Sequence, residues 1–162
     1  MAETEAKSED RHPAEVITAM VDRVLGMAAT WPSWDGQPFV VPMEDEPPRT
    51  YTPHKAIRRV ADHLVDHLAE IEARLAGLPP EPDHWHASAI TTQADLAAFT
   101  QEDLDEARSR LRRLALIWDA RLRSLTDEQL DAPSGEAWTL RQVALHLDGS
   151  DFYAKSVGML ST

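Results

Sequence analysis

The sequence predicts an all-α protein, and three observations make it a four-helix bundle. Apolar residues recur at spacings of three and four in four separate segments, as they do along one face of a helix. No segment alternates apolar and polar residues in the manner of a half-buried strand. Long proline-rich segments separate the helical ones, so the order in which the helices wind around the bundle stays open.

The first two helices have clear boundaries. The first is expected from Pro13 to Ala29, because a proline in the first helical turn lacks an N–H that would have no partner there. The second begins at a Thr52 cap and ends at Gly77, just before two prolines. Residues 30–50 are too rich in proline for a helix, and this loop is either a cover or contact surface or a simple packed crossover.

The third helix is long and ends near Leu125. Its start is either Asp95 or Thr100, because Thr100 and Asp103 have the spacing of a capping box. A second proline-led loop, residues 79–94, precedes it.

A turn-rich segment with one short helical turn at Asp127–Leu130 leads to the last helix. That helix begins at a Thr139 cap and carries the remaining residues. Residues 1–12 are polar and charged and are expected to be a disordered tail, which leaves residues 13–162 as a single domain.

The composition excludes several classes of site and partner. The formal net charge of -12 gives a surface that repels nucleic acids and anionic membranes, so we expect neither as a partner. The absence of cysteine excludes disulfides, thiolate metal sites and a cysteine nucleophile. The longest apolar run, Leu114–Trp118, is far shorter than the roughly 20 residues of a membrane span. The acidic N-terminus lacks the apolar core of a signal peptide, which favours a cytoplasmic location.

Three histidines form a candidate metal site. His63 and His67 are four residues apart on the second helix, so they share one face, and His67 falls in the apolar register. Buried neutral imidazoles need partners for both ring nitrogens, and a shared metal ion meets that need. His146 stands at the edge of the apolar face of the last helix and could supply a third ligand. Imidazole ligands suit zinc, nickel or iron, and three of them leave a position open.

Nearby carboxylates and the other histidines are weaker candidates. Four acidic residues could orient the imidazoles or act as a base, although acids on such a chain are mostly solvated; they are Asp62, Asp66, Asp148 and Asp151. The remaining four histidines are expected to be exposed or locally hydrogen-bonded; they are His12, His54, His84 and His86.

The segment WTLRQVALHL, from Trp138, resembles the tryptophan-started helix of the DinB/YfiT-like family of metal-dependent four-helix-bundle proteins. In that family this helix carries one metal-binding histidine and another helix carries an HxxxH pair. His146 matches the lone histidine, and His63 with His67 matches the pair. The preceding residues 118–138 also look like the family's lead-in, and the resemblance covers roughly residues 51–162.

The order of the motifs departs from the family pattern, in which the lone histidine comes first. Either the bundle is circularly permuted, or RRVADHL at 58–64 is an internal echo of RQVALHL at 141–147, which makes His63 equivalent to His146 and His67 an addition. The resemblance implies a divalent metal, zinc or nickel above all. It also implies a hydrolase or a thiol S-transferase or isomerase that acts on a small molecule or thiol.

Two other readings remain open at the level of sequence. The protein could be a non-catalytic interaction or structural module with packed histidines, in which the aromatic loop at 31–48 forms a binding surface or a homodimer contact. The histidine pair could also be a pH-sensitive element, because two adjacent buried imidazoles resist double protonation.

Overall fold

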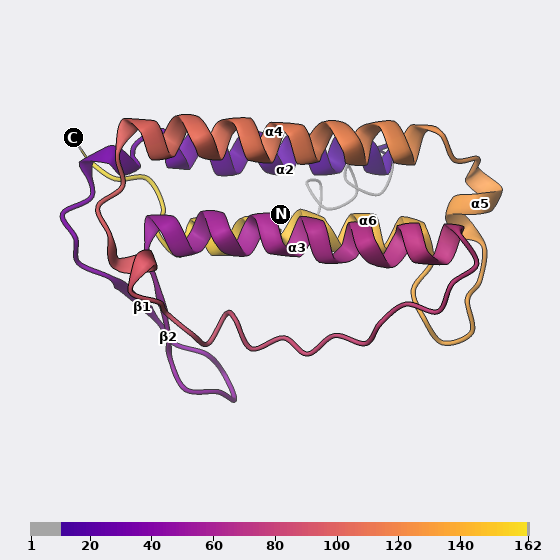
Figure 1. The fold of residues 1–162 in the computed structure, drawn as a ribbon, viewed down its shortest axis with the longest axis horizontal. Helices are drawn as coiled ribbons and strands as arrows, with labels where there is room; N and C mark the ends of the chain where they lie inside the picture. The colour runs from indigo at the N-terminus through magenta and orange to yellow at the C-terminus, as the bar shows by residue number, and fades with distance from the viewer. Residues whose placement is uncertain (1–10, 162) are drawn as a thin grey trace.

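The computed structural model describes residues 11–161 and confirms a helical bundle. Three long helices are α2 (Pro13–Ala28), α3 (Pro53–Leu75) and α4 (Gln101–Arg123). The fourth member is a C-terminal arm of three short segments, defined as α6 (Leu140–His146), η3 (Leu147–Ser150) and α7 (Asp151–Lys155). Figure 1 shows the four members side by side with their axes aligned.

The winding order, which the sequence left open, is visible in Figure 1. The helix α2 and the C-terminal arm run in one direction, and α3 and α4 run in the other. The helix α2 packs on α4 and on the arm, while α3 packs on α4 and on the arm. Because the neighbours α3 and α4 are parallel, the chain between them must return along the whole bundle. We call residues 78–93, which do so along the outside of α3, the strap.

The predicted helix starts are confirmed by their caps. The Thr52 side chain accepts a hydrogen bond from the Lys55 N–H at the start of α3. Thr100 and Asp103 form a full capping box, so α4 begins at Gln101 and not at the earlier alternative. A separate short helix, η2 (Ala94–Leu96), precedes that cap. The predicted turn before the C-terminal arm is the helix α5 (Asp127–Asp131).

The proline-rich loop after α2 contains elements that the sequence analysis did not predict. A short helix, η1 (Trp31–Ser33), is followed by an antiparallel hairpin of β1 (Phe39–Val41) and β2 (Arg49–Tyr51), with Phe39 opposite Tyr51. The prolines lie outside both strands, and the strands consist largely of β-branched and aromatic residues, which favour extended backbone. Three-residue strands are too short to produce a visible alternation.

The expectation of one continuous last helix is wrong. The arm tightens into η3 after His146, and Gly149, a weak helix former, lies in that segment. The helix α7 ends at Lys155, and Gly158 then adopts a φ of 77°, a left-handed conformation that suits glycine.

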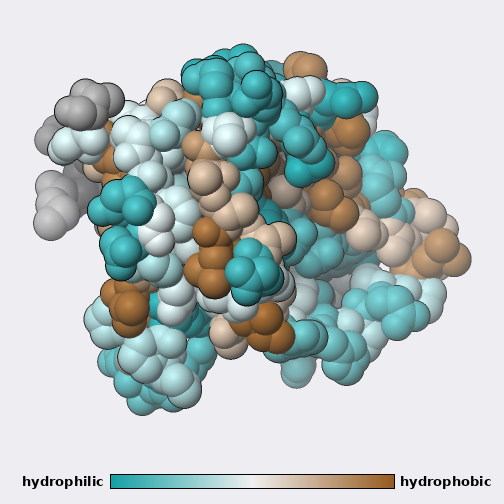
Figure 2. Space-filling model, turned by 60° about the vertical axis from the view of Figure 1, so that its left-hand side comes forward, coloured by the Kyte–Doolittle hydropathy of each residue, from teal (hydrophilic) through white to brown (hydrophobic). Residues whose placement is uncertain are grey.

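Apolar packing holds the bundle together. Trp31 and Trp118 are fully buried, and each indole N–H has a partner: Trp31 donates to the Gly158 carbonyl at 2.7 Å and Trp118 to the Leu64 carbonyl at 3.0 Å. On the face in Figure 2, apolar residues stand among hydrophilic ones. Within residues 11–161 no helix is long and apolar enough to cross a membrane.

The prediction of a disordered tail at residues 1–12 concerns residues that the structure mostly does not describe. Most of the proposed tail, residues 1–10, lies outside the described residues. His12 is described, and its Nδ1 accepts a hydrogen bond from the Ala14 N–H as the N-cap of α2.

Candidate metal centre

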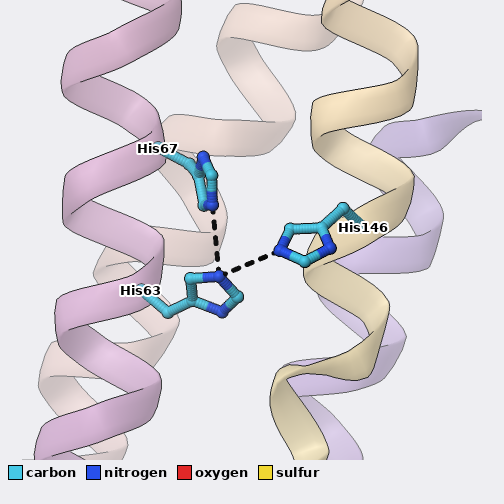
Figure 3. A group of neighbouring side chains, drawn as sticks. All are labelled: His63, His67 and His146. Carbon is cyan, nitrogen blue, oxygen red and sulfur yellow. Dashed lines mark hydrogen bonds between the residues drawn. The ribbon is translucent and has the colours of Figure 1, made fainter. Parts of the chain in front are cut away.

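The three predicted histidines converge, as Figure 3 shows. The Nε2 atom of His63 lies 3.1 Å from Nε2 of His67 and 3.2 Å from Nε2 of His146. One nitrogen from each ring forms a group whose members all lie within 4.8 Å of one another. The structure therefore places together the residues that the sequence analysis chose as candidate metal ligands.

The positions of the three rings follow from the helices that carry them. His63 and His67 project from adjacent turns of α3, so their ring centroids lie 4.8 Å apart. The C-terminal arm packs antiparallel along that face of α3, and His146 is the last residue of α6. One helix thus supplies a pair and its neighbour supplies the third ring.

The outer nitrogens are fixed by two partners. His67 Nδ1 lies 2.8 Å from a carboxylate oxygen of Glu70, and His63 Nδ1 lies 2.7 Å from the hydroxyl of Ser150. An ionised carboxylate only accepts hydrogen bonds, so Nδ1 of His67 carries the proton. In neutral His67 the Nε2 atom then carries a lone pair, which faces the other two rings.

With this proton on His67, neither tautomer of His63 gives all three inner nitrogens a hydrogen-bond partner of their own. If His63 also donates through Nδ1, to the Ser150 hydroxyl, its Nε2 lone pair meets that of His67 at 3.1 Å. If His63 carries its proton on Nε2, that single N–H faces two acceptors, His67 and His146. A cation at the centre satisfies all three nitrogens together.

The two separations from His63 fit a shared metal ion, and the third, between His67 and His146, lies within 4.8 Å. Zinc–nitrogen bonds of about 2.0–2.1 Å in a tetrahedral site put neighbouring nitrogens about 3.3–3.4 Å apart. The separations of 3.1 and 3.2 Å from His63 are close to that value. A hydrogen bond from the outer nitrogen of a metal-binding imidazole is also usual, and His63 and His67 both have one.

The electrostatics favour neutral rings, which is the form that binds metal. Burial, and then the neighbouring His67 and His146, lower the pKa of His63 to about 3. Burial, and next the His67 ring, lower the pKa of His146 against a smaller opposing effect of Glu70. Protons therefore compete weakly with a metal ion for the inner nitrogens of His63 and His146 near neutral pH.

Aromatic side chains surround the cluster but leave one side open. The Trp85 ring, from the strap, lies 5.4 Å from the rings of both His63 and His67. The Trp138 ring lies 4.7 Å from that of His146. His63 and His67 are each 6% exposed, whereas His146 is exposed to solvent. A ligand could therefore reach the cluster past His146.

The carboxylates proposed to orient the imidazoles do not do so. Asp148 and Asp151 form ion pairs with Arg23 at 2.6 and 3.0 Å, and Asp62 pairs with Arg59. The fourth, Asp66, makes no hydrogen bond to the cluster and lines a groove between α3 and α4. Ion pairing with arginines of the same surface explains most of these positions.

The actual outer partners, Glu70 and Ser150, were missed. Glu70 lies three residues after His67, on the same helical face, and that spacing could have indicated it. Ser150 lies four residues after His146 but bonds to His63 across the bundle, so only the packing of η3 on α3 reveals it.

The remaining histidines lie outside the cluster. His12 caps α2, and His54 Nε2 lies 3.0 Å from the Ala98 carbonyl. His84 and His86 are exposed, and His86 Nδ1 lies 3.3 Å from the His84 carbonyl. Between them, Trp85 is the strap residue that reaches the cluster.

Comparisons of the chain with family models, with curated proteins and with solved structures found no match.

Proposed function

We propose that this protein binds a divalent metal ion through His63, His67 and His146. The observation that carries the proposal is the convergence of their three Nε2 atoms, with the outer nitrogens of the α3 pair held by Glu70 and Ser150. The donor set is all nitrogen, which suits zinc or nickel first and iron next.

The proposal extends to a DinB/YfiT-like protein that acts on a small molecule. The contact between the Trp138 and His146 rings supports it, because the tryptophan-started helix is the segment that carries the resemblance. The lone histidine follows the pair along the chain, yet the bundle brings all three rings to one place. Motif order therefore does not argue against the site.

The proposed activity is a metal-dependent thiol S-transfer or hydrolysis. A divalent ion held by three imidazoles lowers the pKa of a water molecule or a thiol that takes its remaining position. The carboxylate of Glu70 keeps the proton of His67 on Nδ1, and Ser150 orients His63. Trp85 and Trp138 limit the access of water around the rings.

The test is the metal content of untagged protein by elemental mass spectrometry. We expect near-stoichiometric zinc, nickel or iron in the wild type and its loss in His67→Ala. His84→Ala, which removes an exposed histidine outside the cluster, is the matched control and should keep the metal. Wild-type protein that is metal-free and takes up no added zinc or nickel would contradict the proposal and favour an interaction module with packed histidines.

A further inference from the structure

The histidine pair is the end of a longer column of polar residues on α3. Lys55, Arg59, His63 and His67 follow one another at four-residue steps, so each stands about 6 Å along the helix axis from the next. All four are buried. The column thus begins with two cations and ends with two imidazoles.

Lys55 is a buried ammonium that forms no ion pair within residues 11–161. It is fully buried, and Nζ donates to the Thr50 carbonyl at 2.6 Å and to the Thr91 hydroxyl at 3.0 Å. Nζ also lies 4.8 Å from the centre of the Tyr51 ring. Within residues 11–161 no carboxylate lies within 4.0 Å of it. Burial, and then the neighbouring Arg58, lowers the pKa of Lys55 to about 8 against the opposing effect of Asp95.

Arg59 adds a second buried cation. It is 3% exposed, and its Nε donates to the Ser88 hydroxyl at 2.9 Å. Its Nη1 donates to Asp62 at 2.9 Å, and the guanidinium lies 5.4 Å from the centre of the Tyr153 ring. These bonds use two of the five N–H donors of an arginine. Asp62 is therefore the ion-pair partner of Arg59 and does not extend to Lys55, whose acidic neighbour is the more distant Asp95.

The Tyr51 hydroxyl is a buried polar group that lacks a partner in the described chain. Tyr51 is fully buried, and its O–H has no acceptor there; its charged neighbour is the Arg49 guanidinium, which can only donate. Leaving such a group unpaired costs free energy, so the position needs a reason. The Tyr153 ring connects this region to the metal centre, since it lies 6.1 Å from the Tyr51 ring and 6.2 Å from the His63 ring.

The strap covers the column with side chains that can be displaced. Its Thr91, Ser88 and Trp85 contact Lys55, Arg59 and the histidines in turn. No residue of the strap is buried, so little apolar packing holds it in place. Two of its three contacts are neutral hydroxyls, which a carboxylate can replace with stronger, charge-assisted hydrogen bonds.

We propose that Lys55, Arg59 and the Tyr51 hydroxyl bind the carboxylate of a small organic acid whose second polar group reaches the three histidines. The carboxylate balances the excess buried positive charge and gives the Tyr51 hydroxyl an acceptor. The column sets the geometry, because Arg59 is one helical turn from His63. This proposal names a substrate class for the proposed function. Only the contact of the second polar group with the three histidines rests on the proposed metal ion, and binding of the carboxylate does not.

The test compares two thiols that differ in one charge. We would titrate 3-mercaptopropionate and 3-mercapto-1-propanol, followed by NMR, into zinc-loaded protein and into protein stripped by a chelator. We expect the wild type to bind the acid about tenfold or more tightly than the alcohol in both forms, since a charged hydrogen bond is worth at least that factor. Arg59→Met and Lys55→Met should each reduce this preference and leave alcohol binding unchanged. Arg112→Met removes an exposed positive charge on α4 and should change nothing.

Tyr51→Phe keeps the test independent of folding defects. The substitution removes a hydroxyl that has no partner in the described chain, so stability should be kept or raised while affinity for the acid falls several-fold. Equal binding of acid and alcohol by the wild type, or an acid preference that survives all three substitutions, would overturn the carboxylate subsite. Zinc content measured beside each titration reports separately on the metal centre, because the acid preference is expected with and without zinc.

Discussion

The two halves of the bundle are built differently. The helices α2 and α4 bury only apolar side chains against each other. Apart from Tyr51, every buried polar residue in the described part of the chain lies instead on α3 and its cap, on η2 or on the C-terminal arm; these are Thr52, Lys55, Arg59, His63, His67, Asp95, Ser150 and Asp151. A close-packed apolar half can supply the stability that a half rich in buried charge and imidazole lacks. The difference indicates that packing between α2 and α4 stabilises the fold, while α3 and the C-terminal arm carry the candidate site.

The largest expected effect comes from breaking the apolar half. Trp118→Ala on α4 removes a fully buried ring and should lower the free energy of unfolding by about 3–5 kcal/mol, because it leaves a cavity and frees the Leu64 carbonyl. Urea denaturation followed by circular dichroism measures the loss. Ile117→Ala, at the neighbouring and 51% exposed position, is the control and should cost far less. Equal losses at the two positions would refute this division of roles.

The next effect concerns the half that holds the histidines, which metal binding should stabilise. Zinc at one hundred times its dissociation constant should stabilise the wild type by about 2.7 kcal/mol, because the folded state alone holds the three histidines together. A thermal melt with and without zinc measures the shift. His63→Ala should lose the shift, and Ile117→Ala should keep it. A shift that persists in His63→Ala would place the metal elsewhere.

The outer partners should tune this affinity without removing it. Ser150→Ala and Glu70→Gln each disturb the hydrogen bond that orients one imidazole, so metal affinity should fall about 10–100-fold. Competition with a chromophoric chelator gives the constants. Asp148→Asn, which alters an ion pair with Arg23, is the matched control. If that variant weakened zinc binding as much as Ser150→Ala, the assignment of outer partners would be wrong.

The last effect is a pH dependence in metal-free protein. The pKa of His63 is lowered to about 3 by burial and the adjacent rings, so between that value and its unfolded value near 6.5 the unfolded chain binds more protons. Stability from this group is fully present above about pH 6.5 and is lost as pH falls, with a slope of at most about 1.4 kcal/mol per pH unit. The difference between wild-type and His63→Ala stability curves isolates the effect. Parallel curves from pH 4 to 8 would contradict it.

The features that the sequence could predict are those set by local spacing. Helical periodicity and threonine caps identified the starts of α3 and α4, and a four-residue step put His63 beside His67. His146 followed from its place at the edge of an apolar face. Each of these inferences needed only residues within a few turns of one another.

The features that the sequence could not predict depend on contacts between distant segments. The parallel arrangement of α3 and α4, and hence the strap and its Trp85, follows from a winding order that helix positions alone do not fix. Ser150 bonds to His63 only because η3 packs on α3. The hairpin strands β1 and β2 pair across a proline-rich loop and are too short for a pattern to show.

The central claim, a metal ion held by the three histidines, is tested most directly by X-ray absorption spectroscopy of zinc-loaded protein. The account predicts three imidazole nitrogens at about 2.0–2.1 Å, one of them lost in His146→Ala. A spectrum of oxygen ligands without imidazole scattering, unchanged in that variant, would contradict it.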